Sequence, residues 1–260
     1  DLAINDIVNG ANILENDLVI EIGPGLGSMT SILLEKAKKV ICVELDKKMI
    51  KILNDRFIAY SNIELINEDI LKLDLNSIIK EEKEKNKFQN VKIVANLPYY
   101  ITTPIIMKLL ESNLDIESIT VMIQKEVADR LIEVPSGKNT GAITYTVYYY
   151  CESSKIREVE NTSFIPMPEV KSEVINLKLR KEPAVQVENK KIFFSIIKCS
   201  YMQRRKTLIN GLVNTGVFKN KEEGIEILKT LGLREDIRAE NLTIEDFARL
   251  TNLFCQRAKK

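Results

Sequence analysis

The fold is decided by the sequence LVIEIGPGLG, residues 18–27. Its first half, Leu18–Ile22, is a short apolar run typical of a buried parallel strand. Its second half places glycine at positions 23, 25 and 27, directly before a helical pattern over Ser28–Ala37. Glycines between a strand and a helix let the backbone approach a ligand closely, and the N–H groups at the helix start become donors. We therefore expect a cofactor-binding loop here, although strand-to-helix turns without a ligand also use glycine.

Short apolar runs and longer amphipathic stretches alternate through the first two thirds of the chain. This alternation predicts an α/β fold, in which a mostly parallel sheet carries helices on both faces. The strands are expected at Leu18–Ile22, Val40–Leu45, Ile63–Ile66, Val91–Ala95 and Ile119–Ile123. The helices between them are expected at Ser28–Ala37, Lys47–Ile58 and Thr103–Leu110. Two later runs rich in β-branched and aromatic residues, Thr144–Tyr150 and Val174–Leu179, are expected to add an antiparallel edge pair.

Acidic residues stand at the ends of the first three strands. A dinucleotide fingerprint, G-x-G-x-x-G, would need glycine where Ser28 stands, so an oxidoreductase with such a cofactor is a weak alternative. Glu44, about 20 residues beyond the glycines, can hold both hydroxyls of a ribose. Asp69 can accept a hydrogen bond from an adenine amine, although alone it would more simply be a surface acid. The pattern resembles motif I of the Rossmann-like methyltransferases that use S-adenosylmethionine (SAM). The pattern makes Glu21, Gly23, Gly25, Glu44 and Asp69 the candidate cofactor-binding residues, and the family resemblance given below adds Asn96.

The fourth strand ends in the sequence NLPYY, residues 96–100. It matches the (Asn/Asp)-Pro/Leu-Pro-(Tyr/Phe) motif of methyltransferases that act on exocyclic amino groups. An adenine amine is a poor nucleophile because its lone pair is delocalised into the ring. If the Asn96 side chain and the Leu97 carbonyl accept its two N–H bonds, the lone pair is oriented and the developing positive charge is stabilised. Pro98 fixes the backbone direction, and Tyr99 offers a face to an extruded base. Without a ligand, the segment would be a strand-end turn with buried tyrosines.

Three segments together resemble the ribosomal RNA adenine dimethyltransferases of the KsgA family. They are NLPYYITTPIIMKLLE at 96–111, F-x-P-x-P-x-V-x-S at 164–172 and R-R-K-T-L-x-N at 204–210. The resemblance implies transfer of four methyl groups from SAM to two adjacent adenosines, each of which becomes N6,N6-dimethyladenosine. It also implies that these adenosines lie in a hairpin loop near the 3′ end of small-subunit ribosomal RNA. The implied target-base pocket, which supplies the candidate catalytic residues, consists of Asn96, Leu97, Tyr99 and Phe164. Phe164 would stack on the adenine opposite Tyr99, or would be a core phenylalanine.

The chain changes character after Arg180. Helices are expected at Lys191–Tyr201, Arg204–Asn214, Lys221–Leu231 and Thr243–Arg257. We therefore expect a methyltransferase domain over residues 1–180 and a small helical RNA-binding domain over residues 181–260. The second part has a formal net charge of +6 and the first part −5, and such asymmetry suggests that the basic part meets a polyanion. The candidate RNA contacts are Arg204, Arg205 and Lys206, with a solvated helix start as the plainer alternative.

The sequence contains no histidine and no tryptophan. It therefore excludes histidine general bases, Ser–His and Cys–His nucleophiles and histidine metal sites, and we expect no metal. The four cysteines lie far apart, which argues against a zinc site or a redox motif. Cys42 and Cys151 lie in apolar runs, which indicates core thiols of a reducing compartment. Because no signal peptide or membrane-spanning stretch is visible, we expect a cytoplasmic protein. We also expect it to be a monomer. Its partner would be small-subunit ribosomal RNA within the immature small subunit, and no membrane.

Two further alternatives stay open. An Erm-type methyltransferase acting on large-subunit RNA would share the fold and the pocket, but the P-x-P-x-V-x-S and RRKTL segments favour the small-subunit enzymes. The second alternative is a binding protein that uses this fold without catalysis, and the intact NLPY and GPGLG segments argue against it. One departure concerns the start of the chain, because the family carries a G-Q-N-F-L segment shortly before this position. We expect the numbered sequence, which begins at Asp1, to lack an N-terminal piece of the native protein.

Overall fold

The computed structural model describes residues 2–137, 139–161 and 169–258, and its chain divides into two compact units. The first unit consists of residues 1–128 and 152–179, and the second of residues 129–151 and 180–260. This division differs from the expected one at residue 180, because residues 129–151 group with the C-terminal helices. No helix among the described residues has the length and apolar character needed to cross a membrane.

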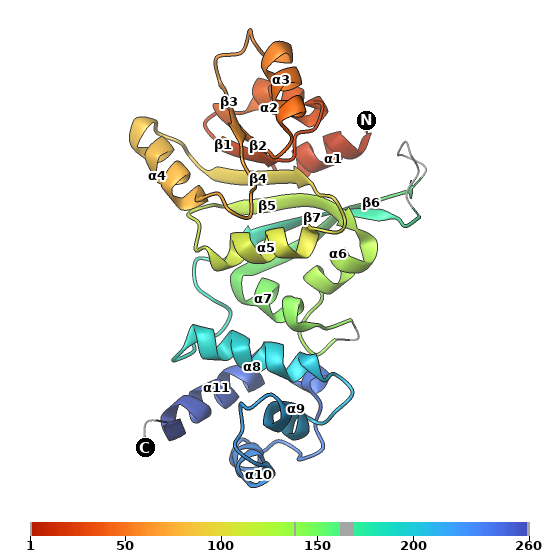
Figure 1. Cartoon of the computed structure of the whole chain (residues 1–260), viewed down its shortest axis with the longest axis vertical. Coiled ribbons are helices and arrows are strands. Elements are labelled where there is room, and N and C mark those ends of the chain that lie inside the picture. Colours follow the sequence, from red (N-terminus) through yellow and green to blue (C-terminus); the bar gives the residue numbers. More distant parts are fainter. Residues whose placement is uncertain (1, 138, 162–168, 259–260) are drawn as a thin grey trace. The chain divides into compact units, whose positions relative to one another are not determined.

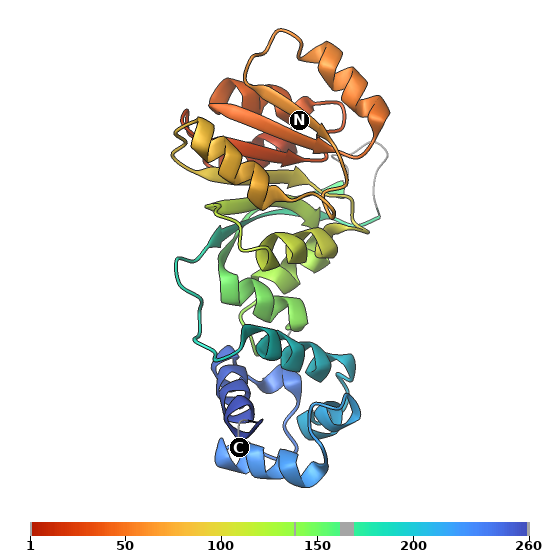
Figure 2. The ribbon, with the colours of Figure 1, turned by 60° about the vertical axis from the view of Figure 1, so that its left-hand side comes forward.

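The first unit is built on a seven-stranded sheet with the order β3-β2-β1-β4-β5-β7-β6 (Figures 1 and 2). The strands are β1 (Leu18–Ile22), β2 (Lys39–Glu44), β3 (Ile63–Asn67), β4 (Val91–Asn96), β5 (Ser118–Gln124), β6 (Cys151–Val159) and β7 (Ser172–Leu179). The neighbouring strands among β1 to β5 are parallel, and β7 is antiparallel to β5. The expected class, a mostly parallel α/β sheet with an antiparallel edge, is confirmed.

Helices cover both faces of this sheet because the strand order reverses at β1. The connections β1–β2–β3 run outward in one direction and β3–β4–β5 return in the other, so right-handed crossovers put their helices on opposite faces. The helices of this unit are α1 (Leu2–Gly10), α2 (Ser28–Lys36), α3 (Lys47–Arg56), α4 (Leu75–Lys85) and α5 (Thr102–Glu111). The boundary between the two units falls within α6 (Lys125–Ile132). α1, α2 and α3 share one core, which includes Leu33 and Leu53, with the sheet. The reversal opens a crevice beyond the carboxyl ends of β1 and β4, where ligands of such sheets bind.

The second unit is helical. Its helices are α7 (Ala142–Tyr150), α8 (Lys190–Met202), α9 (Leu208–Asn214), α10 (Lys221–Thr230) and α11 (Ile244–Ala258). They enclose a core that contains Phe193, Leu212, Phe218 and Phe247, each no more than 1% exposed.

The prediction that Thr144–Tyr150 is a strand is wrong, since this segment lies in α7. The Tyr145 ring packs edge-on against Phe247 at 5.0 Å, and its hydroxyl donates to the Leu242 carbonyl at 2.6 Å. Tyr149 packs against Phe193 at 5.5 Å. Burial of these rings in the helical core outweighs the strand preference of β-branched and aromatic residues. The edge strand β6 forms from the next residues instead.

The expected helix at Arg204–Asn214 begins four residues later than predicted, at Leu208. The Thr207 hydroxyl accepts the Asn210 N–H as an N-cap, which sets the helix start. The Lys206 N–H donates to the Gln203 carbonyl at 2.8 Å, so Arg204–Lys206 lie in a turn before α9.

A buried ion pair lies at the amino ends of β1 and β4, opposite the crevice. It joins Asp17, which directly precedes β1, to Lys92 of β4. Lys92 is 2% exposed, and its ammonium lies 2.8 Å from the carboxylate of the fully buried Asp17. Glu117 lies 3.5 Å from the same ammonium, which also donates to the Asn12 carbonyl at 2.5 Å. The three acceptors satisfy the charge that Lys92 brings into the interior.

Replacing this lysine should destabilise the protein strongly. Lys92→Met leaves Asp17 buried without its cation, so we expect the free energy of unfolding to fall by about 3–5 kcal/mol. Urea unfolding of both proteins measures it. Lys85→Met removes a lysine from the exposed Glu81 pair of α4 and should change stability little. Equal losses in the two variants would contradict the structural role of the buried pair.

Candidate active site

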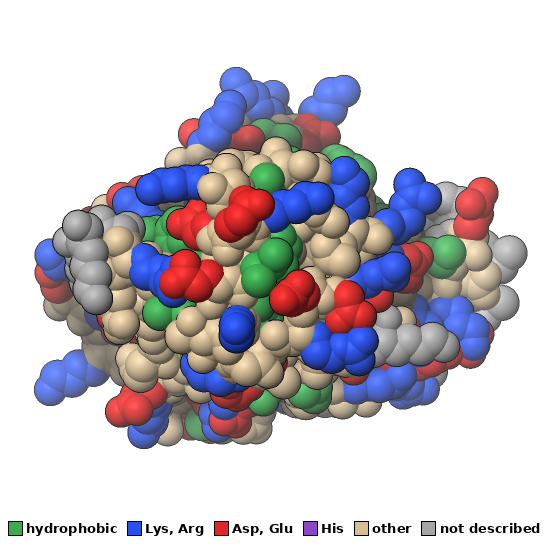
Figure 3. Space-filling model, turned by 90° about the horizontal axis from the view of Figure 1, so that it is seen from below, with side chains coloured by type: hydrophobic (Ala, Val, Ile, Leu, Met, Phe, Trp, Pro, Cys, Tyr) green, Lys and Arg blue, Asp and Glu red, His purple; other side chains and the backbone are tan. Residues whose placement is uncertain are grey.

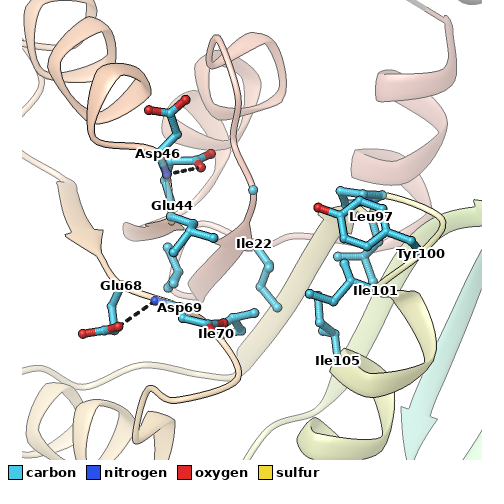
Figure 4. Close-up of a pocket in the computed structure, with 14 residues that line it drawn as sticks. Ile22, Glu44, Asp46, Glu68, Asp69, Ile70, Leu97, Tyr100, Ile101 and Ile105 are labelled. Atoms are coloured by element: carbon cyan, nitrogen blue, oxygen red, sulfur yellow. Dashed lines mark hydrogen bonds between the residues drawn. The ribbon is translucent and has the colours of Figure 1, made fainter.

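A cavity of about 270 Å³ lies at the carboxyl ends of β1 to β4 (Figure 4). The turn after β1 and the ends of β2 and β3 form one wall, and the turn between β4 and α5 forms the other. Its lining residues are Ile22, Gly23, Val43, Glu44, Leu45, Asp46, Glu68, Asp69, Ile70, Leu97, Pro98, Tyr100, Ile101 and Ile105. The structure thus brings together the predicted residues Gly23, Glu44, Asp69 and Leu97, which come from four different strand ends.

The turn after β1 has the conformation that only glycine adopts readily. Gly23 and Gly25 have φ of +68° and +55°, and a Cβ on either would meet nothing within 4 Å. A Cβ on Gly27, in contrast, would collide with the ring of Phe57. Gly27 therefore lets the turn pack on α3, while Gly23 and Gly25 leave space in which a ligand can approach the backbone.

Arg56, which the sequence analysis missed, holds this turn from α3. One of its guanidinium nitrogens donates to the Leu26 carbonyl at 2.6 Å, and the other donates to the Ser31 hydroxyl at 3.2 Å. The guanidinium also lies over the Phe57 ring, 5.4 Å from its centre. No sequence pattern indicates this contact, since it joins residues 30 positions apart.

Two of the predicted acids, Glu44 and Asp69, line the cavity. The carboxylate of each accepts the backbone N–H of the residue two positions later. Glu44 ends β2, and its carboxylate accepts the Asp46 N–H at 2.9 Å. Asp69 follows β3, and its Oδ1 accepts the Leu71 N–H at 2.9 Å. Glu68, whose carboxylate accepts the Asp69 N–H at 2.8 Å, adds a further acid that the sequence analysis did not single out. The wall is therefore suited to hydroxyl and amino groups, which donate hydrogen bonds to carboxylates.

Glu21 lies below this wall and does not line the cavity. It is fully buried, and the Thr30 hydroxyl donates to its Oε2 at 2.6 Å. Burial raises its pKa from 4.5 to about 7, against the opposing hydrogen bonds from Thr30 and Cys42. Burial and the nearby Glu21 also raise the pKa of the Cys42 thiol, which keeps it protonated. The assignment of Glu21 as a cofactor-binding residue stays a prediction. Its observed hydrogen bonds, from Thr30 of α2 and Cys42 of β2, join the elements that flank the glycine turn.

The NLPYY segment begins at the last residue of β4. Asn96 is exposed and does not line the cavity, while the Leu97 N–H donates to the Met122 carbonyl at 3.3 Å. Tyr99 is partly buried, and its hydroxyl lies 2.9 Å from that of Ser172. This contact joins the NLPYY segment to the last serine of the F-x-P-x-P-x-V-x-S pattern. Phe164, predicted to face Tyr99 across the target base, lies outside the described residues.

The predicted RNA contacts are exposed in the helical unit. Arg204 forms an ion pair with Glu240, with 3.2 Å between Nε and the carboxylate. On the face shown in Figure 3, Lys and Arg side chains are interspersed with Asp and Glu. The basic side chains on that face therefore do not form one continuous patch. Among the described residues, no group of three or more Cys, Asp or Glu is arranged to hold a metal ion.

The raised pKa of Glu21 predicts how stability depends on pH. Between about pH 4.5 and 7 the folded state keeps a proton on Glu21 that the unfolded chain has lost, so rising pH destabilises the fold. Glu21→Gln removes this titration. We expect the stability of the variant relative to the wild type to rise by about 3 kcal/mol between pH 4.5 and 8. Urea unfolding at both pH values measures the difference, and a pH-independent difference would contradict the assignment.

The family model described as ribosomal RNA adenine dimethylase matches residues 1–256. Ribosomal RNA small subunit methyltransferase A of Lachnoclostridium phytofermentans is 46% identical over 258 residues, which cover 98% of this chain and 88% of the relative. A dimethyladenosine transferase of Plasmodium falciparum superposes with a TM-score of 0.80 at 26% identity, covering 98% of this chain and 96% of that one. The 23S rRNA methyltransferase ErmE superposes with a TM-score of 0.69 at 22% identity, covering 98% of both chains, and so shows a common fold alone. On this similarity, which extends over nearly its whole length, the chain belongs to the ribosomal RNA adenine dimethylase family.

Proposed function

We propose that this chain is a SAM-dependent enzyme that converts two adjacent adenosines of small-subunit ribosomal RNA into N6,N6-dimethyladenosine. The target adenosines would lie in the hairpin loop near the 3′ end of that RNA. One observation carries the proposal: the NLPYY segment and the glycine turn border the same cavity, so a methyl donor and an amino acceptor can meet there. Family membership supplies the reaction class.

The cavity suits SAM because it combines open space beside the backbone with hydrogen-bond acceptors. Gly23 and Gly25 leave open space beside the backbone, and Glu44 and Asp69 present carboxylates for ribose hydroxyls and an adenine amine. Asn96 is the further residue that we expect to contact SAM. When bound, SAM supplies a methyl group already activated by its sulfonium. The chain therefore needs no residue that activates the donor, which agrees with a sequence free of histidine.

The chain's own task is to present the adenine amine. The Asn96 side chain is exposed and the Leu97 carbonyl follows it directly, so both can accept the two N–H bonds of the amine. Pro98 holds this turn, because its carbonyl accepts the Ile101 N–H and the Thr102 hydroxyl. Tyr99, tied to Ser172, and Phe164 would stack on the two faces of the extruded base. The amino proton leaves to water after transfer.

The helical unit would hold the RNA through phosphate contacts of Arg204, Arg205 and Lys206, which position the substrate without reading its sequence. The substrate would be an immature small subunit, and methylation would thereby be coupled to ribosome assembly. We expect the enzyme to act as a monomer in the cytoplasm, where small subunits assemble. An enzyme for large-subunit RNA is the less supported reading, because the relatives at 44–46% identity are named for the small subunit.

The test is transfer of labelled methyl groups from SAM to purified, under-methylated ribosomal subunits. The proposal expects label in the RNA of the small subunit and none in that of the large subunit. Label confined to the large subunit would establish the Erm-type alternative. Tight binding of small subunits without any label would establish a binding protein.

Asn96 provides the sharpest catalytic prediction. Asn96→Ala removes one of two acceptors for the amine, so we expect SAM to bind detectably while methyl transfer falls by roughly 10²–10³-fold. Calorimetry measures binding, and single-turnover transfer measures the rate. Asn54→Ala, which changes an exposed asparagine of α3, is the matched control. Wild-type turnover in the Asn96 variant would refute the acceptor role.

The basic turn before α9 predicts salt-dependent binding. Arg204→Ala combined with Arg205→Ala should weaken RNA binding and flatten the dependence of log K on log salt, because fewer counterions are released. Lys229→Ala combined with Arg234→Ala removes the same charge from the same unit and is the control. Filter binding between 50 and 200 mM salt gives the slopes. An unchanged slope in the first variant would show that the turn does not contact phosphate.

A further inference from the structure

Tyr100 lines the cavity and is nevertheless 86% exposed. Its neighbour Tyr99 is partly buried, and the Tyr99 hydroxyl is hydrogen-bonded to that of Ser172, whereas Tyr100 is exposed. Among residues 2–137, 139–161 and 169–258, no ring contact or hydrogen bond involves its side chain. A tyrosine ring carries a large apolar surface that normally packs against other groups. An unsupported ring at the mouth of a cavity therefore suggests a partner that enters the cavity.

The backbone beneath this ring is held firmly. The Pro98 carbonyl accepts the Ile101 N–H at 3.2 Å and the Thr102 hydroxyl at 3.1 Å, which closes a turn around Tyr100. Position 100 is thus fixed relative to the cavity, and only the two side-chain torsions of the tyrosine are free to adjust. Ordering such a side chain on a ligand costs little conformational entropy.

The two walls of the cavity differ in chemistry. Figure 4 shows Leu97, Tyr100, Ile101 and Ile105 together on one side, and Glu44, Asp46, Glu68 and Asp69 on the other. An adenosyl group consists of a flat adenine ring, whose edge carries an amino group, and a ribose with two hydroxyls. Carboxylates suit the edge and the hydroxyls, while apolar and aromatic side chains suit the faces of the ring.

We propose that Tyr100 is a further cofactor-contacting residue, whose ring packs on the adenosyl group of SAM and shields the cavity from water. This inference rests on the proposed use of SAM. It assigns a role to the second tyrosine of NLPYY, which neither the amine-presenting turn nor the target-base pocket requires. The contact would be made in the absence of RNA and would be the same for SAM and S-adenosylhomocysteine, since both carry the adenosyl group.

The absence of tryptophan from the sequence makes a direct test available. Tyr100→Trp introduces a single indole, and titration of the ligand-free protein with SAM or S-adenosylhomocysteine should produce a saturable change in its emission. Ile58→Trp is the matched control, because Ile58 is 85% exposed and does not line the cavity. Its emission should not respond. A Tyr100→Trp signal that responds to the RNA hairpin alone, and not to SAM, would overturn the inference in favour of an RNA contact.

Binding measurements complete the test. Tyr100→Leu should raise the Kd for SAM by roughly five- to tenfold through loss of the ring contact, whereas Tyr100→Phe should bind about as the wild type does. Calorimetry on the RNA-free protein gives both values. Equal Kd values for Tyr100→Leu and wild type would refute the role of Tyr100 and leave the proposed function intact. Failure of the wild type itself to bind SAM would instead refute the proposed function.

Discussion

The structure depends on the turn after β1, in which three of the five residues at 23–27 are glycines without a side chain. Gly23, Gly25 and Gly27 all have positive φ, and Gly27 alone is pressed against a neighbour, the ring of Phe57. The turn therefore packs on α3 at one end and remains open at the other. Because β1 lies where the strand order reverses, this opening faces the one crevice that a doubly wound sheet leaves for a ligand. The site follows from this constraint combined with parallel register.

The parallel register then brings distant residues to one edge. Glu44 pairs with Asn67, and Asn96 pairs with Met122, so β2 to β5 end side by side. The acids collect on one wall and the NLPYY turn on the other, with the cavity between them. In the proposed function, such a site would orient a methyl donor and an amino acceptor. That is sufficient when the cofactor carries its own leaving group, and it explains how a chain without histidine can be an enzyme.

Local patterns predicted the parallel core and the cavity wall well, because both depend on short-range sequence. The glycines, the acids and the NLPYY motif each lie within a few residues of the end of their own strand, and Gly23, Glu44, Asp69 and Leu97 do line one cavity. Contacts between distant segments escaped prediction. The segment of α7 was predicted as a strand because the partners of its Tyr145 lie about 100 residues away, and Arg56 contacts the glycine turn across 30 positions. Burial of Glu21 likewise depends on α2 and β2, which no local pattern describes.

The most direct measurement of the central claim is mass mapping of small-subunit RNA after incubation with SAM and the purified protein. Under-methylated subunits serve as substrate, and subunits treated with the protein in the absence of SAM serve as control. The account predicts two methyl groups on each of two adjacent adenosines in the 3′-terminal hairpin loop, and no other modified nucleotide. Methylation of a different base, or of an adenosine outside that loop, would contradict it.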